Sequence, residues 1–101
     1  MDAGRVRKLR LMPDYGCWPV WEPGGEPYAL EEEDLPISPA LRERLWEWAG
    51  RFDAILDHDY PPDSAFASPA EEERFREDGR VLARDLAAEL GPGFTVEYRY
   101  R

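Results

Sequence analysis

Large apolar residues between Pro39 and Leu56 recur every three or four positions, which is the spacing of one face of an α-helix. This apolar stripe contains Leu41, Leu45, Trp48, Phe52, Ile55 and Leu56. Ser38 can cap the first turn, and Pro39 stands where a missing amide hydrogen has no cost. The pattern predicts an amphipathic helix over Pro39–Leu56 whose aromatic stripe must be covered by the rest of the chain. Trp46 lies off the stripe, so we expect it at a neighbouring edge of the core or partly exposed at a contact surface.

A second helix is predicted from Pro69 to about Leu90. Ser68 and Glu71 have the spacing of a capping box, and Gly91 is placed to end the helix. The inward stripe of this helix comprises Phe75, Leu82, Leu86 and Leu90, and Gly79 falls on the same line. A glycine inside a helix costs about 1 kcal/mol relative to alanine. We therefore expect Gly79 to mark a close crossing with the first helix.

Alternating apolar and polar residues predict three strands, over Arg5–Met12, Cys17–Glu22 and Phe94–Tyr100. Pro19 would confine the second strand to an edge of the sheet, because proline cannot donate to a strand ladder. The order of elements is then β-β-α-α-β, which predicts an α+β fold. We expect a small antiparallel sheet with two helices packed on one face and the last strand beside the first. Glu97 would then face Lys8 or Arg10 on the outer side of the sheet.

Length and charge limit the classes of function. A chain of 101 residues and 11.7 kDa is long enough for one hydrophobic core, so we expect a single domain. The net charge of −9 argues against nucleic acid or a membrane as a partner, and favours either a basic protein partner or simple solubility. One cysteine cannot form an internal disulfide, and no segment resembles a signal peptide or a membrane span. We expect a cytoplasmic protein, and the oligomeric state is left open.

Several short segments carry a resemblance to a known family. They include Leu11–Trp21 (LMPDYGCWPVW), Leu35–Ser38 (LPIS) and Glu89–Gly91 (ELG). In these motifs and their order the chain resembles a family of short acidic bacterial proteins of unassigned function, so the resemblance implies no particular activity. Members of that family tend to have a tryptophan and paired aspartates where this chain has His58–Pro61, which argues against a role for His58. Small acidic proteins of this kind are similar in character to immunity proteins and antitoxins.

The acidic segment between the two helices is the strongest candidate for a binding site. It contains Asp57, Asp59 and Asp63, and no lysine or arginine occurs between Phe52 and Glu73. Acids in a loop favour solvent, and acids in a first helical turn favour the helix dipole. Solubility does not explain the aromatic residues set among them, Tyr60 in particular, because aromatic side chains between charges are typical of protein-binding surfaces.

A tryptophan of the predicted edge strand is a second candidate. Trp18 and Trp21 would lie on opposite faces of that strand, so at least one should be exposed. We interpret the chain as a non-enzymatic domain that binds a basic protein, as an immunity protein or antitoxin would. The predicted partner-binding residues are Asp57, Asp59, Tyr60, Asp63 and Trp21.

Two alternatives belong to other classes. A small-ligand or metal-binding accessory domain could use the aromatic hairpin, His58 and the acids around it, but the spacing lacks the glycine and the bidentate glutamate of a calcium loop. An enzyme would need Cys17 as its nucleophile with His58 as base, and one such pair far apart in sequence is common by chance. We therefore predict no catalytic residue, no metal site and no cofactor.

Overall fold

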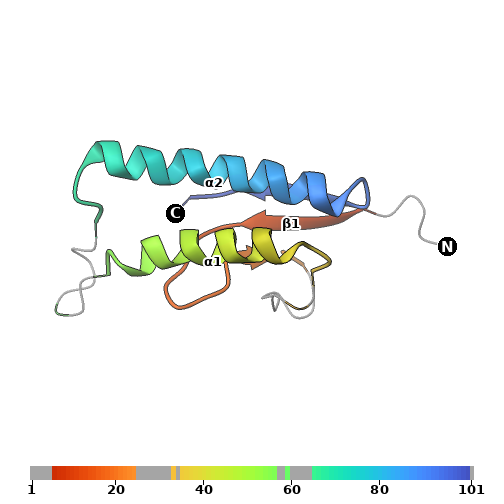
Figure 1. Ribbon diagram of the computed structural model, residues 1–101, viewed down its shortest axis with the longest axis horizontal. Helices are drawn as coiled ribbons and strands as arrows, with labels where there is room; N and C mark the ends of the chain where they lie inside the picture. Colours follow the sequence, from red (N-terminus) through yellow and green to blue (C-terminus); the bar gives the residue numbers. More distant parts are fainter. Residues whose placement is uncertain (1–5, 25–32, 34, 57–58, 60–64, 101) are drawn as a thin grey trace.

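The computed structural model describes residues 6–24, 33, 35–56, 59 and 65–100. It confirms an α+β fold with the predicted order of elements (Figure 1). The elements are β1 (Arg7–Leu11), β2 (Val20–Trp21), α1 (Pro39–Asp53), α2 (Pro69–Leu90) and β3 (Phe94–Tyr98). Both helices lie against the same face of the sheet (Figure 1). Within the described ranges, neither helix is long and apolar enough to cross a membrane.

The sheet is mixed, so the prediction of an antiparallel sheet was wrong in one pairing. Its strand order is β2-β1-β3; β1 pairs with β2 antiparallel and with β3 parallel. The reason is that each successive element reverses the direction of the chain. Ser38 at the start of α1 contacts Glu89 at the end of α2, so the helices are antiparallel and the fifth element must run the same way as the first.

The predicted neighbours across the sheet are confirmed. β3 lies beside β1, and Glu97 is in register with Arg10. The Arg10 guanidinium donates to the Glu97 carboxylate at 2.6 Å on the outer face. β2 is an edge strand, as Pro19 predicted, but it is only two residues long. The residues before β2 belong to a turn and not to the strand. Gly16 in this turn has a φ of 71°, a conformation incompatible with a strand.

The helix caps agree with the sequence. The hydroxyls of Ser38 and Ser68 accept hydrogen bonds from the amides of Leu41 and Glu71, each at 3.2 Å. α2 has the predicted bounds, whereas α1 ends at Asp53 and not at Leu56. The amides of Ile55 and Leu56 bond to carbonyls three residues back, which tightens the last turn and ends the α-helical spacing.

A hydrogen-bonded contact joins the start of α1 to the end of α2. The Glu89 carboxylate accepts from the Ser38 amide at 2.7 Å and from the Ser38 hydroxyl at 2.8 Å. Two of the segments that carry the family resemblance, residues 35–38 and 89–91, therefore meet in space although about fifty residues of chain separate them.

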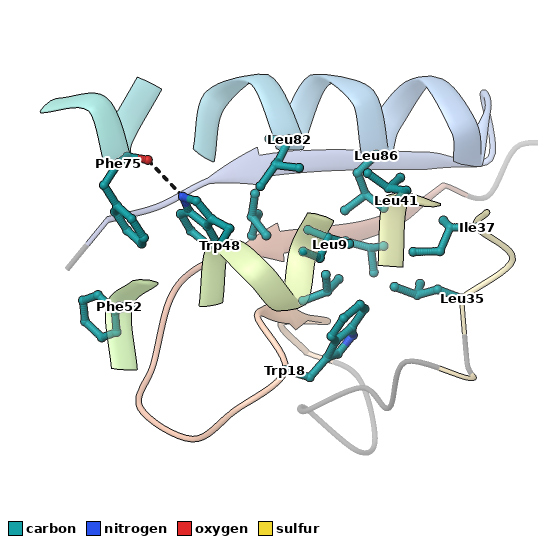
Figure 2. Packing of buried hydrophobic residues seen from close by; sticks show 14 residues of the cluster. Leu9, Trp18, Leu35, Ile37, Leu41, Trp48, Phe52, Phe75, Leu82 and Leu86 are labelled. Atoms are coloured by element: carbon teal, nitrogen blue, oxygen red, sulfur yellow. Dashed lines mark hydrogen bonds between the residues drawn. The ribbon is translucent and has the colours of Figure 1, made fainter. Parts of the chain in front are cut away.

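The core lies between the sheet and the two helices and includes Trp48 of α1 (Figure 2). The Trp48 ring stacks on Phe75 with centroids 4.5 Å apart, and its indole N–H donates to the Phe75 carbonyl at 3.0 Å. Gly79 lies at the crossing, as predicted. A side chain there would collide not only with Trp48 of α1 but also with Tyr98 of β3, so this glycine brings all three elements together.

Candidate partner-binding surface

The turn after β1 packs on the C-terminal end of α1 and brings two carboxylates to that end of the molecule. Tyr15 stacks on Phe52 with centroids 4.5 Å apart, and the Gly16 amide donates to the Asp53 carboxylate at 2.8 Å. Asp14 accepts from the amide of Tyr15, also at 2.8 Å. Within the described part of the chain, neither carboxylate has an arginine or lysine partner, so both keep their charge uncompensated.

These charges affect the pKa of the only cysteine, Cys17. Cys17 is half-buried, and its thiol lies 3.4 Å from the Tyr15 carbonyl. Burial, followed by the negative charges of Asp14 and Asp53, raises the pKa of the thiol. A raised pKa keeps the sulfur protonated at neutral pH, which makes it a poor nucleophile. This environment disfavours the enzyme alternative, and its base candidate His58 lies outside the described residues.

Alkylation of Cys17 therefore measures the electrostatic potential at this end of α1. We expect the alkylation rate to rise with pH at a higher midpoint than in an unstructured cysteine peptide, because nearby carboxylates disfavour the thiolate. Asp53→Asn removes a charge but retains an oxygen that can accept from Gly16, so it should lower the midpoint without restoring the peptide value, since burial is the larger cause. An unchanged midpoint in both Asp53→Asn and Asp14→Asn would contradict this assignment.

The structure describes only part of the predicted binding set. Asp59 is exposed and follows the C-terminal end of α1. Asp57, Tyr60 and Asp63 lie outside the described residues. Trp21 is half-buried beside Arg10 on the outer face of the sheet, and its indole N–H donates to the Met12 carbonyl at 3.0 Å. Trp21 is therefore on the outer face of the sheet, whereas Asp59 follows the helix that packs on the inner face.

The expectation of an exposed tryptophan on the edge strand was wrong. Trp18 precedes β2 and is buried, with 7% of its surface exposed, and Trp21 is half-buried. Trp18 is covered by Trp46 of α1, with ring centroids 5.1 Å apart. Trp46 is the exposed tryptophan, at 43%. The sequence placed Trp46 off the apolar stripe but gave no reason to prefer it over Trp21, because the contact with Trp18 depends on how the turn folds back.

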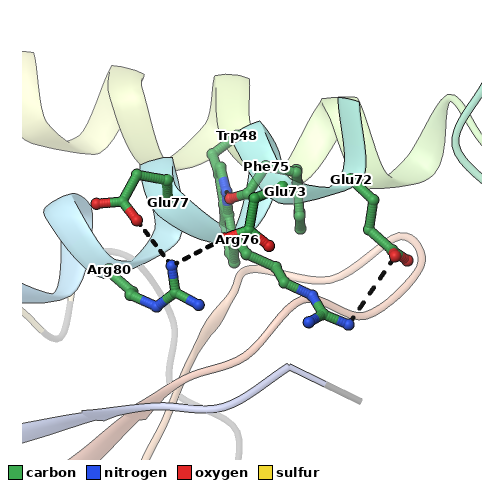
Figure 3. A network of polar contacts seen from close by, with 7 residues as sticks. All are labelled: Trp48, Glu72, Glu73, Phe75, Arg76, Glu77 and Arg80. Carbon is green, nitrogen blue, oxygen red and sulfur yellow. Dashed lines mark hydrogen bonds and ion pairs between the residues drawn. The ribbon is translucent and has the colours of Figure 1, made fainter. Parts of the chain in front are cut away.

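Three acidic residues of α2 pair with arginines of the same helix (Figure 3). Arg80 pairs with Glu77 at 2.7 Å and with Glu73 at 3.5 Å, and Arg76 lies 3.9 Å from Glu72. The first-turn acids were predicted to favour the helix dipole and solvent. Two of the three also pair with arginines, which reduces the net negative charge of this surface.

The acids on the exposed side of α1 have a different environment. Glu43 and Glu47 are both exposed, and neither has an ion-pair partner among the residues that the structure describes. Two of the three arginines of α1 bind aspartates of α2 instead: Arg44 binds Asp85 at 2.8 Å, and Arg51 binds Asp78 at 2.7 Å. Neither glutamate is among the predicted binding residues, although a helical projection places both opposite the apolar stripe.

The described residues offer no support for the metal alternative. Over the described ranges, no group of three or more histidine, cysteine or acidic side chains could hold a metal ion. Glu71, in the first turn of α2, lines a hollow together with Phe66, Arg51 and Arg74. Two guanidinium groups at this hollow disfavour a cation there.

Comparison with protein families gives one match that spans nearly the whole chain. The family model described as Serratia CdiI immunity protein-like matches residues 7–101. This range includes all three strands and both helices, and therefore the surfaces described above. No curated protein matches the chain.

Proposed function

Because this chain belongs to the Serratia CdiI immunity protein-like family, we propose that it is a non-enzymatic immunity protein that binds a toxin of contact-dependent inhibition and blocks a basic site on it. Such a partner would be a protein with positively charged residues in its active cleft, as in enzymes that act on phosphate-containing substrates. Carboxylates of the immunity protein would occupy the positions of the phosphates.

The uncompensated negative charge at the C-terminal end of α1 is the observation that carries this proposal. Asp14 and Asp53 accept from backbone amides there, and no arginine among the described residues pairs with either carboxylate. Asp59 follows them, and the sequence places Asp57 and Asp63 beside it. A concentration of one sign of charge raises the association rate with an oppositely charged partner and makes that rate sensitive to salt.

Aromatic residues would supply the short-range part of the affinity. Tyr60 lies among the acids in sequence, and Trp21 is on the edge strand β2. Because Trp21 faces away from the helices, a partner that contacts both it and Asp59 would reach from the outer face of the sheet to the segment after α1. Rim charges mainly change association rates, whereas buried aromatic anchors mainly change dissociation rates.

Neutralising the acidic loop tests the charge part of the proposal. The partner is first recovered with tagged protein from native lysate at low salt and released at high salt. We expect Asp59→Asn with Asp63→Asn to weaken its binding by roughly 10-fold, mainly through a slower association rate, and to reduce the dependence of that rate on salt. Surface plasmon resonance at several salt concentrations would measure both.

A matched control separates local from global charge. Ala88→Lys with Thr95→Lys makes the same change of +2 in net charge at two exposed positions, on α2 and β3. This variant should lose much less affinity. Equal losses of affinity in the two variants would show that the loop acts only through the net charge of the protein. Unchanged affinity in the Asp59 and Asp63 variant would rule the loop out as a binding site.

A further inference from the structure

The outer face of the sheet has more basic than acidic side chains, although the net charge of the chain is −9. Both helices pack on the inner face, and no helix or strand among the described residues covers the outer one (Figure 1). Leu9 and Leu11 of β1 point into the core, so the residues that alternate with them point outward. By the same alternation, the outer side chains are Lys8, Arg10, Trp21, Thr95, Glu97 and, directly after β3, Arg99.

Two of the three bases on this face are uncompensated. Arg10 binds Glu97, the one acid among these six residues, at 2.6 Å. Lys8 and Arg99 are exposed, and neither has an ion-pair partner in the part of the chain that the structure describes. Three bases and one acid leave a surplus of two positive charges on this face.

A hollow of about 320 Å³ lies beside the Lys8 ammonium group. It is lined by residues of β1 and β3 and by Pro23, which follows β2. Thr95 is opposite Lys8 in the register of the two strands, and its short neutral side chain leaves the charge of Lys8 uncompensated. Glu22, next to Pro23 in sequence, binds Arg7 at 2.8 Å instead.

The sign of the charge selects the groups that this face can bind. Ammonium and guanidinium groups form strong hydrogen-bonded pairs with carboxylates and phosphates. Nucleic acid is disfavoured, because a polyanion would be repelled by the net charge of −9 and by the Glu97 carboxylate on the face itself. A carboxylate side chain of a protein brings a single negative charge, so the repulsion that it meets is smaller.

The proposed partner therefore needs charges of both signs in its interface. Under the proposed function, its basic site meets the C-terminal end of α1, and it also contacts Trp21, which lies beside Arg10 on the outer face. Basic groups of the partner would be repelled by Lys8 and Arg99. The part of the partner that reaches this face would therefore be acidic, and the two opposite polarities would fix its orientation, because like charges would meet in a reversed complex.

We propose that Lys8 and Arg99 on the outer face of the sheet bind carboxylate side chains of the toxin. This inference rests on the proposed function, and adds the chemistry of a second part of the toxin surface. It does not require an open surface on Trp21, because the two bases that carry it are exposed at other positions of the face.

Lys8 is the only lysine of the chain, which permits a residue-specific test. The complex recovered from native lysate is treated with a carbodiimide, which joins an amine to a carboxylate where the two are in contact, and cross-linked peptides are identified by mass spectrometry. We expect Lys8 to be joined to an aspartate or glutamate of the toxin. Lys8→Arg is the matched control, because it keeps the positive charge and removes the amine. It should lose this cross-link and retain the affinity.

The remaining cross-links separate the inference from the proposed function. If carboxylates of this chain are joined to toxin lysines and Lys8 is joined to nothing, the inference is overturned and the proposed function stands. Lys8 joined to a carboxylate of a second copy would assign the face to self-association, and nucleic acid that copurifies with the wild type but not with Lys8→Glu would assign it to nucleic acid. Either result overturns the inference. Recovery of no basic protein would refute the proposed function.

Charge reversal gives a second test, because the inference and the net charge predict opposite effects. Lys8→Glu makes the chain more negative by two charges, which through long-range attraction alone would strengthen binding to a basic toxin. We expect it instead to weaken binding roughly 10-fold, because it places like charges together. Surface plasmon resonance would measure the affinity, and circular dichroism would verify that the variant is folded.

Arg84→Glu provides the matched control for this reversal. It makes the same change of charge on α2, at a side chain that is 76% exposed, and should not weaken binding. Thr95→Lys adds a base to the outer face and should not weaken binding either. Equal effects of Lys8→Glu and Arg84→Glu would overturn the inference and leave the acidic-loop proposal standing.

Discussion

Replacing Gly79 with alanine is expected to lower the free energy of unfolding by about 2 kcal/mol, although alanine is the better helix former. A Cβ at this position would lie 2.7 Å from a ring carbon of Trp48 and 2.9 Å from Cζ of Tyr98, with Cε1 of Tyr98 closer still. Trp48 is 2% exposed and stacked on Phe75, so it has little room to move. Chemical denaturation monitored by circular dichroism would measure the loss.

Gly50 provides the matched control, because it is also a glycine inside a helix. Nothing lies within 4 Å of the position that its Cβ would take. Gly50→Ala should therefore stabilise the protein, by up to about 1 kcal/mol, through the helix preference of alanine alone. If Gly79→Ala were as stabilising as Gly50→Ala, the close crossing of α1, α2 and β3 at Gly79 would be wrong.

Replacing Trp48 with alanine is expected to have the largest effect, a loss of about 3–5 kcal/mol. The substitution removes a ring that fills the space between Phe75 and Gly79, and it leaves the Phe75 carbonyl without its indole donor. Domains of this size have about 5–15 kcal/mol of stability in total, so the variant should be close to unfolding at 37 °C. Thermal unfolding would measure the change.

A second tryptophan of α1 serves as the comparison. Trp46→Ala removes the same side chain two residues earlier, but from a position that is 43% exposed. Its cost should be about 1 kcal/mol, because little cavity is created. Trp48→Phe should fall between the two, since it keeps an aromatic ring and loses the hydrogen bond. Similar losses for Trp46→Ala and Trp48→Ala would contradict the burial that distinguishes these residues.

Local sequence signals predicted the elements of the fold better than their relative directions. Ser68 and Gly91 are strong boundary signals, and α2 begins and ends where they place it. The parallel pairing of β1 and β3 was missed because it is not encoded in either strand. It follows from the number of times the chain reverses direction between the two strands. The predicted order of elements was enough to count these reversals. The early end of α1 was missed because Ile55 continues the apolar spacing of the helix. Its amide, however, donates to the carbonyl three residues back and not to the one four residues back.

The candidate site was harder to predict because it depends on which charges find partners. The sequence does not distinguish Asp78 from Asp53. In the structure Asp78 binds an arginine of α1, whereas Asp53 accepts a hydrogen bond only from a backbone amide among the described residues. The same is true of the tryptophans, since exposure of Trp46 follows from where the turn places Trp18. Asp59 is exposed as a binding residue must be, and its role stays a prediction.

The pairing of β1 with β3 also has a consequence for how the chain folds. The Arg10–Glu97 contact joins positions 87 residues apart, so the central strand cannot complete its hydrogen bonds until the segment that contains β3 has left the ribosome. Contacts of such high sequence separation slow folding, because the loop must close before they form. We therefore expect newly made protein to reach its folded form with a delay after synthesis. Under the proposed function as an immunity protein, cells would need a standing supply of it.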